Sequence, residues 1–287
     1  MRIVIVGASI SGMMASVRWP DALLVEAGMP QSIAPVLASV FYAHQPVPGF
    51  ATKPLRVTTK VLGRNKPRDY AEKVYQNRLL PVSMDSIVPE VQAWQWDFSA
   101  VMADLRASGA HRIRWNTKVV GVDWLHSYLH VMCGGTAEVI PYDHLITSAP
   151  MPVMLKLAEY SSTSTFPPFK SEPIWLRNIP GPEIGKLEDG HIEVTYCSDL
   201  DVLWYRRNQR GYNYEYEFTQ RGYDKLGHEM RLGMVPLRPG KLQPHDHVLE
   251  IREWFKERSI HLVGRYAMWE HKWLSHQTWE QIAEMRL

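Results

Sequence analysis

Cysteine is scarce in this chain, and a long apolar run is missing; each shortage excludes a class of protein. Only two cysteines, Cys133 and Cys197, occur among 287 residues, too few for a disulfide framework and without metal-binding spacing. This scarcity favours a reducing, cytoplasmic compartment. The apolar run from Ile3 to Val6 breaks at Gly7, and no window approaches the roughly 20 apolar residues of a membrane span. We therefore expect a protein without a membrane partner.

The chain also has no large excess of one charge sign, because it contains 32 Lys and Arg and 30 Asp and Glu. Any attraction to nucleic acid or to acidic membranes must therefore be local. No P-loop, G-x-S-x-G or H-E-x-x-H motif occurs, which argues against kinase and hydrolase functions. What is plentiful is apolar material, at 45% with 11% aromatic residues, enough to bury a large core in two cooperating substructures.

The N-terminus carries a nucleotide-binding pattern. Within residues 2–7, Ile3 to Val6 are apolar and β-branched, as in a strand covered on both faces. Residues 7–12 read G-x-G-x-x-G with Ser9 in place of the second glycine. Gly7 permits a tight turn, and Gly12 lets helix and strand approach. The free N–H groups at the helix start favour a pyrophosphate, to which the Ser9 hydroxyl is able to donate.

A helix and a second strand are expected to follow this turn. Residues 13–18 predict a short helix stopped by Pro20, and Ala22 to Val25 predict a strand that ends in Glu26. Glu26 stands 19 residues after Gly7, close to the offset of about 20 at which an acid reaches the ribose hydroxyls of a dinucleotide. The alternative is an α/β turn that binds nothing, with a solvated Glu26.

Further elements can be read along the chain, after an irregular stretch from Pro30 to Pro54. Apolar spacing predicts a helix from Asp97 to Ser108, and Ser275 is a plausible cap for a helix from His276 to Arg286. The predicted strands are Lys118 to Asp123, Tyr128 to Cys133, Ala137 to Ile140, a short run within 142–150, and Ile260 to Val263.

In this order the motifs resemble the flavin-binding scaffold shared by amine oxidases, protoporphyrinogen oxidase and UDP-galactopyranose mutase. Beside the glycine-rich start they include a V-x-x-V strand at 119–122, D-x-L-I-x-x-A-P at 143–150, and G-R-Y-A at 264–267. The resemblance covers residues 1–30, 97–155 and 258–287. It implies an α/β fold, with a Rossmann-like FAD-binding parallel sheet, a β-meander and a smaller α+β substrate domain. Residues 1–40, 97–155 and 258–287 would form the FAD-binding domain, and residues 41–96 and 156–257 the substrate-facing domain.

Position by position, the resemblance implies FAD as the cofactor. The phosphate cradle would comprise Gly7, Ser9, Ile10, Ser11 and Gly12; Glu26 would hold the adenosine ribose, and Val119 or Val120 would contact adenine. Gly264 and Arg265 would approach the pyrophosphate and flavin, the helix start at His276 and Gln277 would face the ring, and Ala149 would also contact the cofactor. A catalytic residue is not evident; candidates are His44, Trp269 and Lys272.

The substrate half holds a basic, aromatic stretch. Strict alternation places Tyr212, Tyr214, Tyr216 and Phe218 on one strand face, able to roof a flavin or stack on a base. The substrate-binding candidates are Tyr205, Arg206, Arg207, Tyr214 and Tyr216, because guanidinium pairs with phosphate and also stacks. A half-buried strand with solvated arginines is the alternative. His245-Asp246-His247 has metal-like residue types, but Asp246 or His247 more simply caps a helix, so we expect no metal.

Together these features favour an FAD-dependent oxidoreductase that removes hydride from a carbon beside nitrogen in an amine or amino-acid-like substrate. The substrate is a small molecule or nucleotide-like. An open, arginine-rich site also suits an amino-acid-modified thymine in phage DNA, in which case the location is the host cytoplasm. Two alternatives stay open: a flavin-dependent nucleotide-sugar mutase, and a non-catalytic binding protein with a flavin fold. The sequence does not indicate the oligomeric state.

Overall fold

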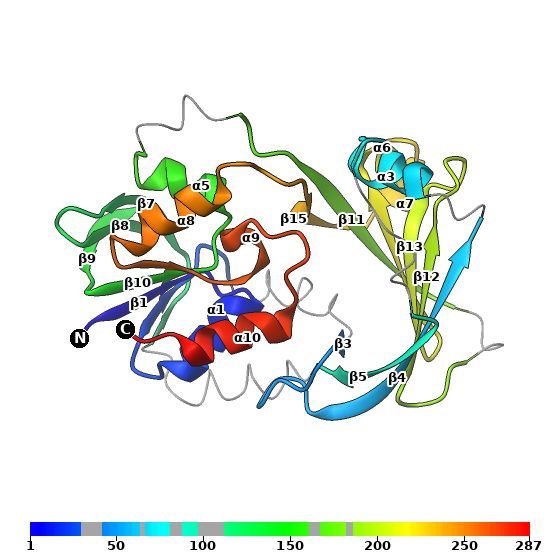
Figure 1. The fold of residues 1–287 in the computed structure, drawn as a ribbon, viewed down its shortest axis with the longest axis horizontal. Coiled ribbons are helices and arrows are strands. Elements are labelled where there is room, and N and C mark those ends of the chain that lie inside the picture. Colours follow the sequence, from blue (N-terminus) through cyan, green and yellow to red (C-terminus); the bar gives the residue numbers. More distant parts are fainter. Residues whose placement is uncertain (30–41, 64–66, 81–87, 97–111, 161–166, 182–185) are drawn as a thin grey trace. The chain divides into compact units, whose positions relative to one another are not determined.

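The computed structural model describes residues 1–29, 42–63, 67–80, 88–96, 112–160, 167–181 and 186–287. The chain forms two compact units (Figure 1), each built from separate segments. Unit 1 comprises Met1–Ala38, Asp97–Lys170 and Pro244–Leu287; unit 2 comprises Ser39–Trp96 and Ser171–Gln243. Unit 1 thus includes residues 156–170 and 244–257, which the sequence assigned to the substrate half. The predicted helix from Asp97 to Ser108 lies outside the described residues.

Unit 1 is built on a five-stranded parallel sheet in the order β16-β10-β1-β2-β6. Its central strand β1 is apolar on consecutive positions because both faces are covered: Val4, Ile5 and Val6 are buried. Four of its five strands were predicted and are confirmed to within a few residues, whereas the strand at 113–114 was not predicted. The bounds are β1 Ile3–Val6, β2 Leu23–Val25, β6 Ile113–Arg114, β10 His144–Thr147 and β16 Ile260–Leu262.

Helices pack around this sheet. Figure 1 shows α1 beside α10, and α8 beside a small antiparallel sheet, where Trp254 of α8 contacts Trp124 at 5.8 Å between ring centroids. Because α8 also packs on β16, residues 244–257 belong to unit 1. The bounds are α1 Ile10–Arg18, α5 Met151–Leu157, α8 Val248–Lys256, α9 Gly264–Met268 and α10 Ser275–Glu284.

Two helix starts differ from expectation. α1 begins at Ile10 rather than at Met13, because Ser9 serves as its N-cap. Ser275 was expected to cap α10 but lies inside its first turn; the N-cap is Leu274, whose N–H donates to the side-chain oxygen of Gln277 at 2.8 Å. A glutamine three residues into a helix satisfies the cap amide in this way.

The predicted β-meander is confirmed as a three-stranded antiparallel sheet in the order β7-β8-β9, with bounds Thr117–Asp123, Tyr128–Cys133 and Thr136–Pro141. Gly134 and Gly135 form the turn between β8 and β9, and both have positive φ, at 56° and 91°. The β7–β8 register shifts between Val119 and Gly121, so Val120 is the extra residue of a bulge.

Unit 2 is one mixed sheet in the order β15-β11-β14-β13-β12-β4-β5-β3, in which only β12 and β4 pair in parallel. One face carries two apolar clusters around Tyr205 and Val194. The strands are β3 Tyr42–Ala43, β4 Lys53–Leu62, β5 Glu90–Gln95, β11 Ser171–Pro180, β12 His191–Cys197, β13 Trp204–Arg210, β14 Asn213–Thr219 and β15 Val235–Leu242, and the helices are α3 Pro67–Tyr75, α6 Gln220–Asp224 and α7 His228–Arg231.

Across the ranges that the structure describes, no helix combines the length and the apolar character needed to cross a bilayer.

Candidate cofactor and substrate sites

The predicted cofactor residues lie mainly at one edge of the unit 1 sheet. Parallel strands β1, β2, β10 and β16 end there together, because Val6 pairs with Val25 on one side and Thr147 on the other, and Thr147 pairs with Leu262. Gly7, Glu26, Ser148 and Gly264 follow these strand ends. This carboxyl edge is where open α/β sheets bind ligands.

Gly7 and Gly12 are both required by close backbone approach. Gly7 has a φ of 91°, and a Cβ there would lie 2.7 Å from the Ser148 hydroxyl oxygen. A Cβ on Gly12 would overlap the carbonyl oxygen of Gly7 itself. The two glycines therefore let the start of α1 lie directly against the end of β1, as the sequence pattern predicted.

Ser9, the departure from the glycine pattern, is accommodated as the N-cap of α1. Its hydroxyl oxygen accepts a weak hydrogen bond from the N–H of Gly12 at 3.4 Å. Because this bond uses a lone pair, the hydroxyl hydrogen is still able to donate to a ligand. The N–H groups of Ile10 and Ser11 belong to the first helical turn and have no partner within the helix. Together with the N–H of Ser9, the Ser9 hydroxyl and the N–H groups of Ile10 and Ser11 make four hydrogen-bond donors at the positive end of α1.

Gly264 brings a second helix to the same place. It has a φ of 84°, and a Cβ there would overlap the Ser11 hydroxyl and lie 3.9 Å from Thr278 Cγ2 of α10. The predicted Gly-Arg turn opens as the short helix α9, and Arg265 Nε donates to the carbonyl of Trp273 at 3.2 Å. The amino ends of α1 and α10 are thus held close around one glycine, an arrangement that favours a bound anion.

The first turn of α10 is only partly free. The side chain of Gln277 is engaged in capping its own helix, so only its backbone can face a ligand. Nδ1 of His276 is buried and has no hydrogen-bond partner among the described residues. A buried ring nitrogen in this state is a natural place for a ligand atom or a water.

Glu26 is held rigidly at the end of β2. Its carboxylate accepts from the N–H of Ala8 at 2.7 Å and from the N–H of Gly28 at 2.6 Å, one on each oxygen. Each oxygen keeps a further lone pair for a ligand hydroxyl. The carbonyl of Glu26 accepts from Thr117 at 2.8 Å, which ties the start of β7 to this edge. Val119 is half-buried and Val120, in the bulge, is exposed.

Ser148 and Thr147 are two residues of this edge that the sequence analysis missed. Ser148 Oγ donates to the carbonyl of Val6 or Gly7, each at 3.2 Å. This bond ties the turn after β1 to the residue that follows β10. Thr147 Oγ1 accepts from the N–H of Ala149 at 3.1 Å. Their signal was the run of small residues that closes the strand before Pro150, which was read as a strand end and no more.

Two of the three catalytic candidates, Trp269 and Lys272, belong to unit 1, and His44 belongs to unit 2. Trp269 is 4% exposed and has a left-handed backbone at the end of α9, which is a packing position. Lys272 is exposed in unit 1. His44 is exposed in unit 2, with an edge contact to Tyr42 at 5.4 Å.

The substrate candidates are divided between the two faces of the unit 2 sheet. Consecutive residues of a strand point in opposite directions, so Arg206 pairs with Glu217 at 3.1 Å, whereas Arg207 lies with Tyr214 on the other face. Of the four aromatic residues predicted to share one strand face, Tyr214, Tyr216 and Phe218 do so, with neighbouring ring centroids 6.3 Å apart. Tyr212 lies before β14 begins at Asn213. The polar residues that alternate with these aromatic residues, Glu215 and Glu217, are buried on the opposite face.

The face with Arg206 holds a buried polar cluster. The Tyr205 hydroxyl donates to Glu217, and the Arg206 guanidinium lies over the ring of Tyr196 at 5.8 Å. Burial favours the neutral form of Glu217, but Arg206 and Lys241 outweigh it and leave the pKa of this carboxyl below its usual value. Burial raises the pKa of Tyr205 well above the usual value, and Glu217 adds to this. The cluster therefore holds one compensated ion pair.

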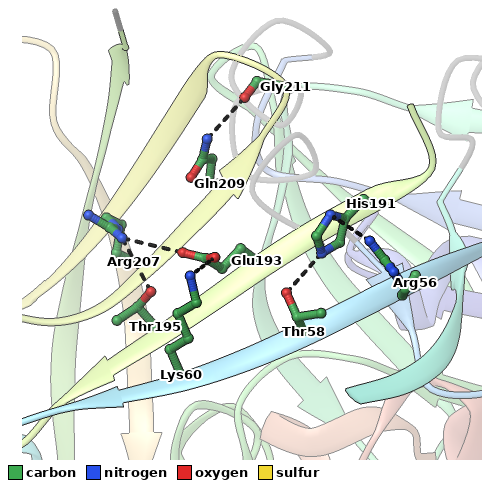
Figure 2. A network of polar contacts seen from close by, with 9 residues as sticks. All are labelled: Arg56, Thr58, Lys60, His191, Glu193, Thr195, Arg207, Gln209 and Gly211. Atoms are coloured by element: carbon green, nitrogen blue, oxygen red, sulfur yellow. Dashed lines mark hydrogen bonds and ion pairs between the residues drawn. The ribbon is translucent and has the colours of Figure 1, made fainter. Parts of the chain in front are cut away.

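Figure 2 shows the polar network on the other face, across β4, β12 and β13. Glu193 lies between Lys60 at 2.5 Å and Arg207 at 3.5 Å. The Arg207 guanidinium is also 5.9 Å from the ring centre of Trp204 and 5.3 Å from that of Tyr214. His191 completes the network, with Nε2 2.8 Å from the hydroxyl of Thr58. This face presents cations interleaved with aromatic rings.

The histidine pair before α8 has local partners. His245 stacks on Phe169 at 3.9 Å between ring centroids, and His247 Nδ1 lies 3.3 Å from a carboxylate oxygen of Glu250. Either Asp246 or His247 was expected to cap α8, and His247 is the N-cap residue. Its side chain makes no capping hydrogen bond.

Comparison with known proteins shows the fold of the chain. No protein-family model matches it, and neither does any curated protein sequence. Among solved structures, a reduced UDP-galactopyranose mutase is similar over 99% of this chain and 94% of its own, with a TM-score of 0.67 and 13% identity.

Two further solved structures match this chain over nearly its whole length and over nearly the whole length of their own chains. A fatty acid isomerase from P. acnes that produces CLA covers 100% of this chain and 99% of its own, with a TM-score of 0.56 and 10% identity. A redesigned putrescine oxidase covers 99% of each, with a TM-score of 0.50 and 10% identity. At these identities the likeness shows the fold alone, and it confirms the predicted α/β architecture with a parallel sheet and a second domain.

Proposed function

We propose that the chain binds FAD at the carboxyl edge of the unit 1 sheet and oxidises a C–N bond of an amine or amino-acid-like substrate. The observation that carries the proposal is the convergence at Gly264, where the Ser11 side chain of α1 leaves no room for a Cβ and Thr278 of α10 lies within van der Waals contact of the same point. A glycine cradle with helix N-termini around it suits a pyrophosphate, and Glu26 beside it suits a ribose. The fold supports the same proposal.

The residues would share the work as follows. Backbone N–H groups of Ile10 and Ser11 and the hydroxyl of Ser9 would bind the phosphates, with Gly7 and Gly12 giving access. Val119 and Val120 would contact adenine, and Ala149, Gly264 and Arg265 would line the path to the ring. The first-turn amides of α10, at His276 and Gln277, would stabilise negative charge on the pyrimidine side. Bound FAD would supply the acceptor for the hydride that leaves the carbon beside nitrogen.

The Arg206 face of unit 2 is the proposed substrate side, because it combines fixed charge with little exposure. Arg206 and Glu217 are ion-paired and their neighbours Tyr205 and Asn208 are buried, so water is largely excluded. In such surroundings a substrate is oriented by few, strong contacts. The protein then has to position the C–H bond and to hold the amine neutral.

A more specific proposal concerns the molecule to which the amine group is attached. The Arg207 face of the same sheet interleaves cations with Trp204 and Tyr214, a combination that binds exposed bases and phosphates. It supports an amine attached to a nucleic acid, as in an amino-acid-modified thymine of phage DNA. Oxidation of an amine-bearing oligonucleotide, but not of the same free amine at equal concentration, would be the expected result; equal rates would argue against it.

The visible absorption spectrum of the purified protein, recorded before and after denaturation, tests the cofactor. We expect flavin bands that move into the supernatant on denaturation and bleach when an amine is added without oxygen. A protein that neither carries nor takes up FAD would overturn the proposal. Turnover of a nucleotide sugar only after prior reduction would replace oxidation by a mutase reaction, and bound flavin that no substrate reduces would favour a binding protein.

A further inference from the structure

Four glutamates are buried in the described part of the chain, all of them in unit 2, and one differs from the others. Glu172 accepts hydrogen bonds from Gln76 and the N–H of Gln220, one on each oxygen. Glu193 is ion-paired with Lys60 and Arg207. Glu217 is ion-paired with Arg206 and accepts a hydrogen bond from the hydroxyl of Tyr205. Glu215 is 1% exposed, and its Oε2 is the one carboxylate oxygen of these four residues without a described partner.

The other oxygen of Glu215 is held in place. Asn208 on the neighbouring strand β13 donates to Oε1 at 3.2 Å, and the same Asn208 accepts from Arg206 Nε at 3.1 Å. Glu215 therefore has a fixed orientation at the end of a chain of three side chains. Its free oxygen is not a consequence of a mobile side chain.

The charges around Glu215 do not neutralise it. Glu217, two residues along the same strand face, repels it, and Arg206 is already paired with Glu217. Lys241 acts on Glu217, and the remaining titratable neighbours of the cluster are the tyrosines Tyr42, Tyr70, Tyr196 and Tyr205. Burial, reinforced by Glu217, raises the pKa of Glu215 to about 8. At neutral pH the group is mainly the uncharged acid.

A buried carboxyl with an unused oxygen is costly unless something binds it. In the acid form Oε2 carries the proton, because Oε1 accepts from Asn208. A cation that displaces this proton would find an acceptor in the ionised Oε2 and would offset the repulsion from Glu217. A primary ammonium group meets both needs, since it carries three N–H donors and a positive charge.

We propose that Glu215 Oε2 binds the ammonium group of the amine substrate and accepts a proton from it. The inference rests on the proposed amine oxidation and names its recognition residue. Binding converts the Glu215 acid to the carboxylate and releases its proton to solvent. The carboxylate then takes one proton from the bound ammonium, which restores the acid and leaves a neutral amine able to lose hydride.

Calorimetric titration with n-butylamine at pH 7, in two buffers of different ionisation enthalpy, tests the proposal on the purified protein. We expect binding with release of close to one proton, and no such release with n-butanol. Glu215→Gln keeps the shape of the side chain and replaces a neutral acid by a neutral amide, so the fold is retained. The variant should bind the amine at least tenfold more weakly and release no proton.

Glu193→Gln is the matched control, because Glu193 is also a buried glutamate, 8% exposed, and lies on the opposite face with its cations in place (Figure 2). It should bind the amine as the native protein does. Native affinity and proton release in Glu215→Gln, or absence of proton-linked amine binding in the native protein, would overturn the inference. Urea unfolding of both variants reports whether they fold.

Flavin content and amine turnover of the same samples separate this inference from the proposed function. If flavin is bound and amines are oxidised but Glu215→Gln leaves KM unchanged, the inference fails and the oxidase function stands. If the protein takes up no flavin yet binds amine through Glu215, the proposed function fails and the ammonium site stands.

Discussion

Arg206 and Arg207 are consecutive in β13 and neutralise two different buried glutamates on opposite faces of one sheet. Arg206 pairs with Glu217 at 3.1 Å and Arg207 with Glu193 at 3.5 Å. The two pairs are not equivalent, because Glu193 has a second direct ion pair, with Lys60 at 2.5 Å, whereas Glu217 also accepts a hydrogen bond from the uncharged hydroxyl of Tyr205. Loss of Arg207 would therefore leave Glu193 paired with Lys60, whereas loss of Arg206 would remove the direct ion pair of Glu217.

Arg206→Gln is expected to destabilise the protein by about 2–4 kcal/mol, because it removes the guanidinium that is ion-paired with the buried carboxylate of Glu217. Arg207→Gln should cost less, about 0–1 kcal/mol, because its side chain is partly exposed and Lys60 remains. Urea unfolding of both variants measures the difference. Equal losses would contradict the assignment of the two faces. If Arg206→Gln does not fold, Arg206→Gln combined with Glu217→Gln should recover part of the stability.

Gly12→Ala is expected to weaken FAD binding and to destabilise the protein by about 1–3 kcal/mol, because the new methyl group would overlap the carbonyl oxygen of Gly7. Flavin content after purification and urea unfolding are the measurements. Gly227→Ala is the control, since a Cβ at Gly227 meets nothing within 4 Å. Normal flavin retention by Gly12→Ala would show that helix and strand can separate without loss of the site.

Glu26→Gln is expected to raise the dissociation constant for FAD by about tenfold, or ~1.4 kcal/mol. The amide keeps one acceptor oxygen, so either the N–H of Ala8 or that of Gly28 loses its partner. Fluorescence titration of the apoprotein with FAD reports the change. Glu138→Gln, which changes a partly exposed glutamate paired with Arg114, should bind as the native protein does. Unchanged affinity in Glu26→Gln would remove Glu26 from the site.

Acid is expected to destabilise unit 1 through His261. On adjacent parallel strands, His261 Nε2 lies 3.2 Å from His144 Nδ1. Burial, with the neighbouring histidine, lowers the pKa of His261 from 6.5 to about 4. The unfolded chain therefore takes up a proton below pH 6.5 that the folded chain refuses until about pH 4, and stability falls across this window.

The stability lost through His261 should be on the order of 1 kcal/mol, after discounting for its partial exposure. Urea midpoints at pH 7.5 and pH 5 measure it. His261→Gln should be less sensitive to this change of pH than the native protein, since the amide does not titrate. A variant with the same pH dependence would assign the acid sensitivity to other groups.

Much of unit 1 was predictable because its determinants are local. The strand ends and the need for Gly7 and Gly12 follow from a few adjacent residues whose backbone geometry is restrictive. Ser148 was not predictable in its role, because its hydroxyl makes two weak contacts to the carbonyls of residues that stand 142 and 141 positions earlier in the chain. The use of Gln277 as a cap was overlooked for the opposite reason: Ser275 offered a simpler local solution.

The substrate side shows where periodicity is insufficient. Alternation in β14 correctly separated tyrosines from glutamates, but it could not say which set is buried. That choice depends on Arg206, Asn208 and Tyr205 of the neighbouring strand, which supply partners for the glutamates. The single sequence shows both strands but not their register, so it treated Arg206 and Arg207 alike.

The order of strands in unit 1 has a consequence for synthesis on the ribosome. β1 and β10 can pair once residue 147 has emerged, but β16, which covers the other edge of β10, follows roughly 110 residues later. At 5–20 residues per second the nascent chain waits about 6–20 s with that edge of β10 open. Gly264 and α10 arrive later still, so the proposed nucleotide site is completed only after translation of unit 2. An exposed strand edge over that interval is a natural target for a chaperone.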